Sequence, residues 1–337
     1  MSIPAPRGEP ASAPSAEWRQ RADALRQRLA DQPLYALAII LAVLFAVLAI
    51  KSPGYRSLHS VSSTVQIAAI LGVIAGGQTL VLLTAGVDLS VASTASAASY
   101  VMAQNSSHGA AYAILIGLAI GLVVGLVNGA GVGVFGVQPL IMTLGVGAIE
   151  GGVLLVYTQS QTNGAPVVPD AVNQLGSGFL LQYLPFDLLI VWLPVSVILI
   201  LGLKFSGLGR AIVAVGDNPI ACRLSGVRTW QVLVATYTIC GLLSAVAGII
   251  LAGNNGSVEA LSASSYLLPS VAAVVIGGTS VFGGVGGYAG TIFGALILTV
   301  LDALLVVVDV SQATRLILYG GIILVLTWAY AQVSGQT

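Results

Sequence analysis

The chain has 337 residues, of which 57% are hydrophobic and only 7% are charged, and its formal net charge is +0. A soluble domain could not cover so much apolar surface, so the composition excludes an ordinary soluble protein and predicts one embedded in a membrane. The balanced charge indicates no nucleic-acid partner. The 41 glycines favour close helix packing and broken helices in lipid. We therefore expect an all-α polytopic membrane protein in contact with the lipid bilayer.

Residues 1–33 are predicted to form a cytoplasmic tail. The first fifteen residues are rich in Pro, Ala and Ser, which is typical of a disordered segment. The stretch "AEWRQRADALRQRLAD" follows, with Trp18, Ala22, Leu25 and Leu29 at helical spacing among arginines. This pattern predicts a basic amphipathic helix on an anionic inner leaflet. Because the basic part is too long for a signal peptide, we expect an uncleaved N-terminus.

The predicted permease domain covers residues 34–332 and contains about ten apolar segments that span, or nearly span, a bilayer. The segments are residues 34–50, 61–86, 89–104, 109–130, 138–157, 186–203, 231–253, 268–282, 287–308 and 314–332. An even number places both termini on one side, with residues 333–337 as a second cytoplasmic tail. The third and eighth segments are short, so the sequence leaves open whether they span or re-enter.

The distribution of basic residues predicts the orientation of these segments. With the N-terminus inside, nine of the twelve basic residues are cytoplasmic: Arg7, Arg19, Arg21, Arg26, Arg28, Lys204, Arg210, Arg223 and Arg228. The predicted outer segments hold only Lys51, Arg56 and Arg315. We therefore expect the N- and C-termini on the cytoplasmic side.

No motif indicates an enzyme, a cofactor site or a metal site. The glycine run "GGTSVFGGVGGYAG" lacks the strand, turn and helix of a nucleotide-binding loop, and it favours a helix break in the membrane. His59 and His108 are far apart in the sequence and form no metal pair. Cys222 and Cys240 are expected to be free thiols.

One predicted cytoplasmic loop, at about residues 204–230, has a helical period of its own. Asp217 or Asn218 is placed to cap a short helix that has Pro219 at its first position. Five residues of this loop are expected to form an apolar stripe broken near Gly216: Ala211, Val215, Pro219, Cys222 and Leu224. Such a helix suits a groove in a partner protein, although a solvated connector is equally compatible with the pattern.

The stretch "GLGRAIVAVGDNPIACRLSGV" resembles the cytoplasmic coupling segment of the ribose/xylose/arabinose permease family of binding-protein-dependent ABC importers. Three more stretches are similar to signatures of that family, in the same order: "GQTLVLLTAGVDLSVAST", "VQPLIMTLGVGAIEGGVLLVYT" and "AAVVIGGTSVFGGVGGYAGTIFGALIL". The resemblance covers roughly residues 34–332. It implies that eight residues form or frame the helix that couples the permease to an ATPase: Gly209, Arg210, Gly216, Asp217, Asn218, Ala221, Ser225 and Gly226.

The resemblance also implies the other subunits of the importer. We expect a second permease chain in a homo- or heterodimer, two cytosolic ABC ATPase subunits or one fused tandem ATPase, and a periplasmic solute-binding protein, all at a bacterial inner membrane. The expected solute is a monosaccharide or a similar small polyhydroxylated compound. An ion-coupled secondary transporter is the alternative, because Gly-broken helices suit such carriers too. The chain departs from the family pattern at Ala92, where Gly is usual, and at Glu150, where Arg is frequent.

Polar residues in the spans are candidates for the lining of a translocation path between two permeases. They are Gln78, Thr79, Thr84, Asp88, Ser90, Ser93, Asn128, Gln138, Thr143, Glu150, Thr279, Ser280 and Phe282. Hydroxyl and amide groups suit a neutral polyol, but Ser and Thr in membrane helices often bond to their own backbone. Asp88 has two open interpretations: contact with the solute, or a cap that accepts hydrogen bonds from the Ser90 and Val91 amides.

Overall fold

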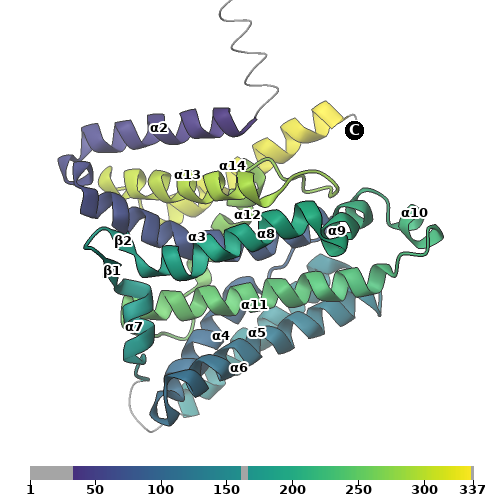
Figure 1. The fold of residues 1–337 in the computed structure, drawn as a ribbon, viewed down its shortest axis with the longest axis horizontal. Helices are drawn as coiled ribbons and strands as arrows, with labels where there is room; N and C mark the ends of the chain where they lie inside the picture. The colour runs from purple at the N-terminus through teal and green to yellow at the C-terminus, as the bar shows by residue number, and fades with distance from the viewer. Residues whose placement is uncertain (1–32, 161–165, 335–337) are drawn as a thin grey trace, which may run out of the picture.

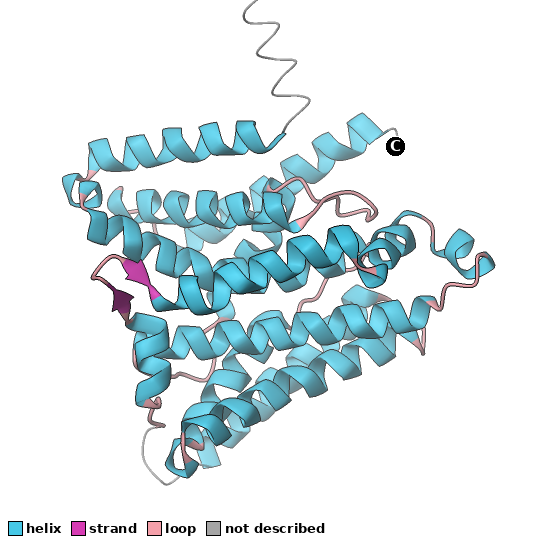
Figure 2. Ribbon diagram, in the orientation of Figure 1, coloured by secondary structure: helices cyan, strands magenta, loops and turns pink. Residues whose placement is uncertain are grey.

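The structure is a computed structural model that describes residues 33–160 and 166–334. The amphipathic helix predicted near the N-terminus lies outside these residues. Figure 2 shows that helices dominate the described chain, with one short β-hairpin in which β1 pairs antiparallel with β2. The elements in chain order are α2 (Pro33–Lys51), η1 (Pro53–Arg56), α3 (Leu58–Leu83), α4 (Val91–Gln104), η2 (Ser106–His108), α5 (Ala110–Gly133), α6 (Pro139–Ser160), α7 (Asp170–Ser177), β1 (Phe179–Leu180), β2 (Leu184–Pro185), the π-helix η3 (Leu188–Trp192), α8 (Leu193–Phe205), α9 (Gly207–Asp217), α10 (Pro219–Leu224), α11 (Thr229–Asn255), η4 (Ser264–Tyr266), α12 (Leu267–Ile276), α13 (Tyr288–Val307) and α14 (Gln312–Ser334).

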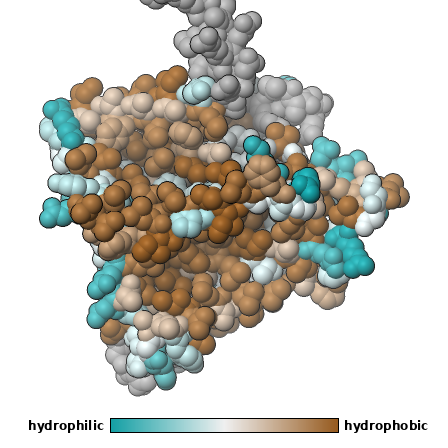
Figure 3. All heavy atoms as spheres, viewed as in Figure 1, coloured by the Kyte–Doolittle hydropathy of each residue, from teal (hydrophilic) through white to brown (hydrophobic). Residues whose placement is uncertain are grey.

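The long helices run roughly along one common direction, which makes the molecule a bundle with two distinct ends (Figure 1). Helix α7 and the β-hairpin lie at one end, and α9 and α10 lie at the other. Helix α2 begins, and α14 ends, toward the end that carries α10. Apolar residues cover the middle of the face in Figure 3, and polar residues gather at the two ends. This banding is what a bilayer imposes on a polytopic protein.

The ten apolar segments predicted from the sequence all correspond to helices, as an all-α polytopic fold requires. Within the described residues, seven helices are long and apolar enough to cross a membrane. Helices α4 and α12 have only 14 and 10 residues, or about 21 and 15 Å of rise, which is less than the roughly 30 Å of a hydrocarbon core. Neither helix is long enough to cross the core by itself, and each has one end at a break whose residues, such as Ser90 and Thr279, are buried.

Helix α3 forms the centre of the bundle, and glycines bring its neighbours close together. Most of α3 is buried, from Ala68 to Leu83 without interruption. Beside it, α5 packs on α11 through Gly121, Gly125 and Gly129, which recur every four residues. A Cβ on Gly121 would overlap the carbonyl oxygen of Gly241. Small residues at this spacing allow two backbones to touch, which supplies the packing that holds helices together in lipid.

The loop that is predicted to be cytoplasmic folds as two helices, α9 and α10, which meet at Asn218, close to the break in the apolar stripe that was expected near Gly216. Asn218 caps α10, because its Oδ1 accepts hydrogen bonds from the amides of Ile220 and Ala221 at 3.1 and 2.9 Å. The predicted cap with Pro219 at the first helical position is therefore confirmed. Two members of the predicted stripe, Val215 and Cys222, are buried, whereas Leu224 at its end is 85% exposed. The extended backbone at Asn218 turns α10 away from the direction of α9, which breaks the stripe.

Candidate functional site: two helix breaks and a backbone junction

The first break lies between α3 and α4, and side chains hold it together. The left-handed Ala85, with φ of 59°, reverses the chain after α3. The Gln78 side chain then holds the backbone of Asp88 at both ends: its Nε2 donates to the Asp88 carbonyl at 2.6 Å, and its Oε1 accepts from the Asp88 amide at 3.3 Å. A fully buried amide thus pairs backbone groups that no helix satisfies at this point.

The Asp88 carboxylate turns toward the start of α4. Its Oδ1 accepts from the Ser90 amide at 2.9 Å and from the Ser90 hydroxyl at 2.6 Å. The predicted bond to the Ser90 amide is confirmed. The second donor is the Ser90 hydroxyl in place of the Val91 amide, because α4 begins at Val91 with Ser90 as its N-cap residue. Asp88 therefore anchors the turn that precedes the helix and is 1% exposed.

Helices α5 and α6 complete this network. Asn128 of α5 donates to the Ser90 hydroxyl oxygen at 2.8 Å. Thr143 of α6 accepts from the Leu89 amide at 3.0 Å. Further along, Thr94 donates to Glu150 Oε2 at 3.0 Å. The other Glu150 oxygen is buried and has no hydrogen-bond partner among the described residues.

The second break, between α12 and α13, is built from glycine backbone. Gly278, Gly283, Gly284 and Gly286 all have positive φ, which L side chains rarely adopt. The loop closes through backbone bonds such as Ser280 N to the Val285 carbonyl at 2.9 Å. A Cβ on Gly290 of α13 would overlap the Gly277 carbonyl oxygen at the end of α12. The glycine-rich run is thus a helix break inside the membrane protein, as the sequence predicted.

The two breaks meet the loop that is predicted to be cytoplasmic at one junction. The Gly284 amide donates to the Leu83 carbonyl at the end of α3, at 3.0 Å. Gly216 of α9 packs on the same carbonyl so closely that a Cβ on it would overlap the oxygen and lie 2.7 Å from Gly284 N. Asp217 follows directly, and its Cα would lie 3.0 Å from a Cβ on Gly284. We call Leu83, Gly216, Asp217 and Gly284 the junction.

The predicted coupling residues have different positions around this junction. Gly209 packs α9 on the backbone of α8, and Gly216 belongs to the junction itself. Arg210 donates to the Phe205 carbonyl at 3.1 Å. Asp217, Asn218, Ala221, Ser225 and Gly226 are exposed in and beside α10.

Sequence reasoning named only one of the two largest apolar side chains of α10, because it placed Leu224 in the apolar stripe and left out Ile220. Ile220 is 61% exposed and Leu224 is 85% exposed, four residues apart on one helix. Residues at this spacing share a helix face. The signal for Ile220 was present in the sequence, but the expected stripe used Pro219 and Cys222, and Cys222 is buried.

The structure brings together only part of the predicted path. Gln78, Asp88, Ser90, Asn128 and Thr143 form the single buried network of the first break. Three others, Thr84, Ser93 and Glu150, are partly buried beside it. Thr79 faces Thr291 of α13, with their hydroxyl oxygens 2.8 Å apart. Thr279 and Ser280 are buried in the second break, whereas Phe282 and Gln138 are exposed. That these residues line a path stays a prediction.

Comparison with known proteins gives one consistent family. The family model described as "Branched-chain amino acid transport system / permease component" matches residues 60–327. The chain is 34% identical over 300 residues to the ribose import permease protein RbsC of Escherichia coli (strain K12), covering 85% of this chain and 90% of that one. It is 34% identical over 275 residues to the fructose import permease protein FrcC of Rhizobium meliloti, covering 80% and 76%. It is 33% identical over 294 residues to the probable ABC transporter permease protein YphD of Escherichia coli (strain K12), covering 86% of each.

No solved structure matches the chain. The family match covers both helix breaks, the junction and α10, so it includes every part of the site described above. The names of these relatives do not favour an ion-coupled secondary carrier. The chain therefore belongs to this family of permease components and is the permease subunit of an ABC importer.

Proposed function

We propose that this permease carries a monosaccharide, or a similar small polyhydroxylated solute, into the cytoplasm of a bacterial cell. ATP hydrolysis in partner subunits would drive the movement, because no segment of this chain carries an ATP-binding signature. The partners are two ABC ATPase subunits or a tandem ATPase, a second permease chain and a solute-binding protein. Relatives named as ribose and fructose import permeases support the solute class.

The junction is the observation that carries the proposal. A partner that binds α10 moves Asn218 and Asp217, and these residues are continuous with Gly216. Gly216 touches the Leu83 carbonyl without room for a methyl group, and that carbonyl is already bonded to Gly284. Movement of α10 therefore reaches the end of α3 and the glycine loop of the second break together. Packed backbones of this kind shift between discrete arrangements rather than deforming gradually.

The exposed face of α10 supports binding of an ATPase at this end. Ile220 and Leu224 offer two apolar side chains, and the basic Arg223 lies between them in sequence. A short helix with such a face fits an apolar groove with an acidic edge. The solute-binding protein would then bind at the opposite end of the bundle, which carries α7 and the β-hairpin (Figure 1).

Gly216→Ala tests the proposal, with Gly207→Ala as a matched control in the same helix. Around a Cβ on Gly207 nothing lies within 4 Å, whereas Gly216 has no space for one. We expect Gly216→Ala to lower uptake of labelled ribose at least about tenfold in cells that express the complete importer. The ATPase should still co-purify with this variant, because the α10 surface is unchanged. Gly207→Ala should transport normally.

Two outcomes would contradict the proposal. If Gly216→Ala transports as well as Gly207→Ala, the junction does not transmit the movement of α10. If wild-type uptake resists vanadate and is abolished by an ionophore, ATP does not drive transport. Size-exclusion profiles of both glycine variants separate a transport defect from failure to fold.

A further inference from the structure

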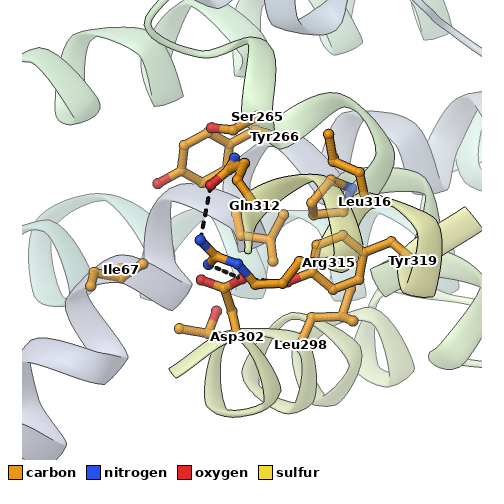
Figure 4. Close-up of a pocket in the computed structure, with 12 residues that line it drawn as sticks. Ile67, Ser265, Tyr266, Leu298, Asp302, Gln312, Arg315, Leu316 and Tyr319 are labelled. Atoms are coloured by element: carbon orange, nitrogen blue, oxygen red, sulfur yellow. Dashed lines mark hydrogen bonds and ion pairs between the residues drawn. The ribbon is translucent and has the colours of Figure 1, made fainter. Parts of the chain in front are cut away.

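A second polar cluster lies away from both helix breaks, in a pocket between α3, α12, α13 and α14. Asp302 of α13 and Arg315 of α14 form an ion pair, with Nη1 2.7 Å from Oδ1. The same guanidinium donates from Nη2 to Gln312 Oε1 at 2.9 Å, and the Tyr319 hydroxyl donates to Asp302. Figure 4 shows Arg315 between Asp302 and Gln312, with Ser265 and Tyr266 on the facing side.

These groups surround a real cavity. Its volume is about 150 Å³, which is room for about five water molecules at roughly 30 Å³ each, or for a small organic molecule. The walls combine polar side chains with aliphatic and aromatic ones, among them Ile67, Leu71 and two tyrosines. A cavity that needed only to fit an ion pair would be closed by side-chain packing.

The polar atoms of the pocket are not all used. The Arg315 Nε is buried and has no hydrogen-bond partner among the described residues. Asp302 is 42% exposed at its side chain, whereas Arg315 is 16% exposed. The ion pair has no net charge, so it favours a neutral ligand over an anionic or a cationic one. Donors and acceptors beside the two tyrosine rings suit a molecule with many hydroxyl groups and one apolar face.

The pocket also has a suitable position for a solute that enters the protein. It lies where η4 precedes α12 and where α13 passes to α14, at the side that the Lys and Arg distribution predicts to be extracytoplasmic. From Leu71 in its wall, α3 continues for seven residues, about 10 Å, to Gln78 of the first break. Helix α12 leads from Tyr266 to the second break.

We propose that the pocket around Asp302 and Arg315 binds the neutral polyhydroxylated solute within a single permease chain, before the solute reaches the helix breaks. This inference rests on the proposed function and adds a site to it. Arg315 and Gln312 donate to solute hydroxyls, Asp302 accepts from them, and Tyr266 and Tyr319 contact the apolar face of the sugar ring.

A cysteine in the pocket wall tests occupancy directly. Ser265→Cys is labelled with a membrane-impermeant maleimide in right-side-out membrane vesicles, with Ser107→Cys, an exposed serine of η2, as the matched control. The native Cys222 and Cys240 are buried, so the wild-type chain gives the background. D-ribose, D-fructose and L-leucine are the probes. We expect the sugars to slow labelling of Ser265→Cys about fivefold when four-fifths of the pockets are occupied. Leucine should have no effect, and Ser107→Cys should react at one rate throughout.

A second variant asks whether the ion pair provides the ligands. Asp302→Asn with Arg315→Gln keeps amides in both places and leaves no unpaired charge. In the Ser265→Cys background, we expect the sugar concentration for half protection to rise at least about tenfold. Size-exclusion profiles verify that this variant remains folded.

Several results would overturn the pocket while leaving the proposed function in place. They are sugar import by cells without sugar protection of Ser265→Cys, protection by leucine alone, or unchanged protection in the double variant. Absence of labelling at both cysteines also contradicts solute binding in the pocket, because it places both residues away from the outer surface. Failure of the wild-type importer to take up either sugar contradicts the proposed function instead.

Discussion

The two helix breaks pair their backbone N–H and C=O groups in different ways. At the first break, side chains supply the missing partners: Gln78 bonds both backbone groups of Asp88, and the Asp88 carboxylate bonds Ser90. At the second break, the backbone bonds to itself through a loop whose glycines adopt positive φ. Unpaired backbone groups are costly in lipid, and both arrangements avoid them.

This difference predicts which substitutions each break tolerates. A side-chain network fails when a polar group is lost, but it accepts a group of similar shape and hydrogen bonding. A glycine loop fails when a methyl group is added, whatever its polarity. The junction is a contact of the second kind, because backbone atoms of Gly216 and Gly284 meet the Leu83 carbonyl at the end of α3.

The largest effect is expected at the second break, from Gly290→Ala. The added methyl group would overlap the Gly277 carbonyl, and neither backbone can move without separating α12 from α13. We expect a loss of more than about 3 kcal/mol in the free energy of unfolding, seen as a large fall in Tm in detergent. Gly287→Ala is the control, because Gly287 has extended backbone and nothing lies within 4 Å of its Cβ position. Equal Tm values for the two variants would show that the close contact is not required.

A smaller effect is expected at the first break, from Asp88→Ala. The change leaves the Ser90 amide and hydroxyl without their acceptor in a buried site. We expect a loss of about 2–3 kcal/mol in the free energy of unfolding. Asp88→Asn keeps the Oδ1 acceptor and should retain most of the stability.

Transport by the Asn variant separates the two roles that the sequence left open for Asp88. Normal uptake supports the anchor. If Asp88→Asn is as stable as the wild type but imports no sugar, the carboxylate has a direct role in the path.

The smallest loss in the free energy of unfolding is expected from Gly278→Ala, which tests backbone conformation without a steric clash. Gly278 has φ of 85°, and nothing lies within 4 Å of its Cβ position. We expect a loss of about 1 kcal/mol, the cost of placing an L residue in the left-handed region. Gly278→Asn should lose less, because asparagine tolerates this region better. A loss equal to that of Gly290→Ala would mean that the loop, rather than the helix contact, limits stability.

Much of the fold was predictable because membrane helices and their caps are properties of neighbouring residues. Hydropathy located all ten apolar segments, and the pattern Asn218–Pro219 predicted the start of α10. The Asp302–Arg315 pocket was missed. An acidic residue in an apolar span is a signal of the same kind as Asp88, but no local pattern pairs Asp302 with Arg315 thirteen residues later.

Composition, hydropathy and four ordered signatures were enough to predict a membrane permease of this family, with a capped cytoplasmic helix and two broken segments. They were not enough to say what those parts touch. Gly216 meets Leu83 and Gly284 only because α9 folds back on the bundle, across 133 residues on one side and 68 on the other. Such contacts depend on how whole helices pack, and a glycine at the junction looks in sequence like any glycine in a loop.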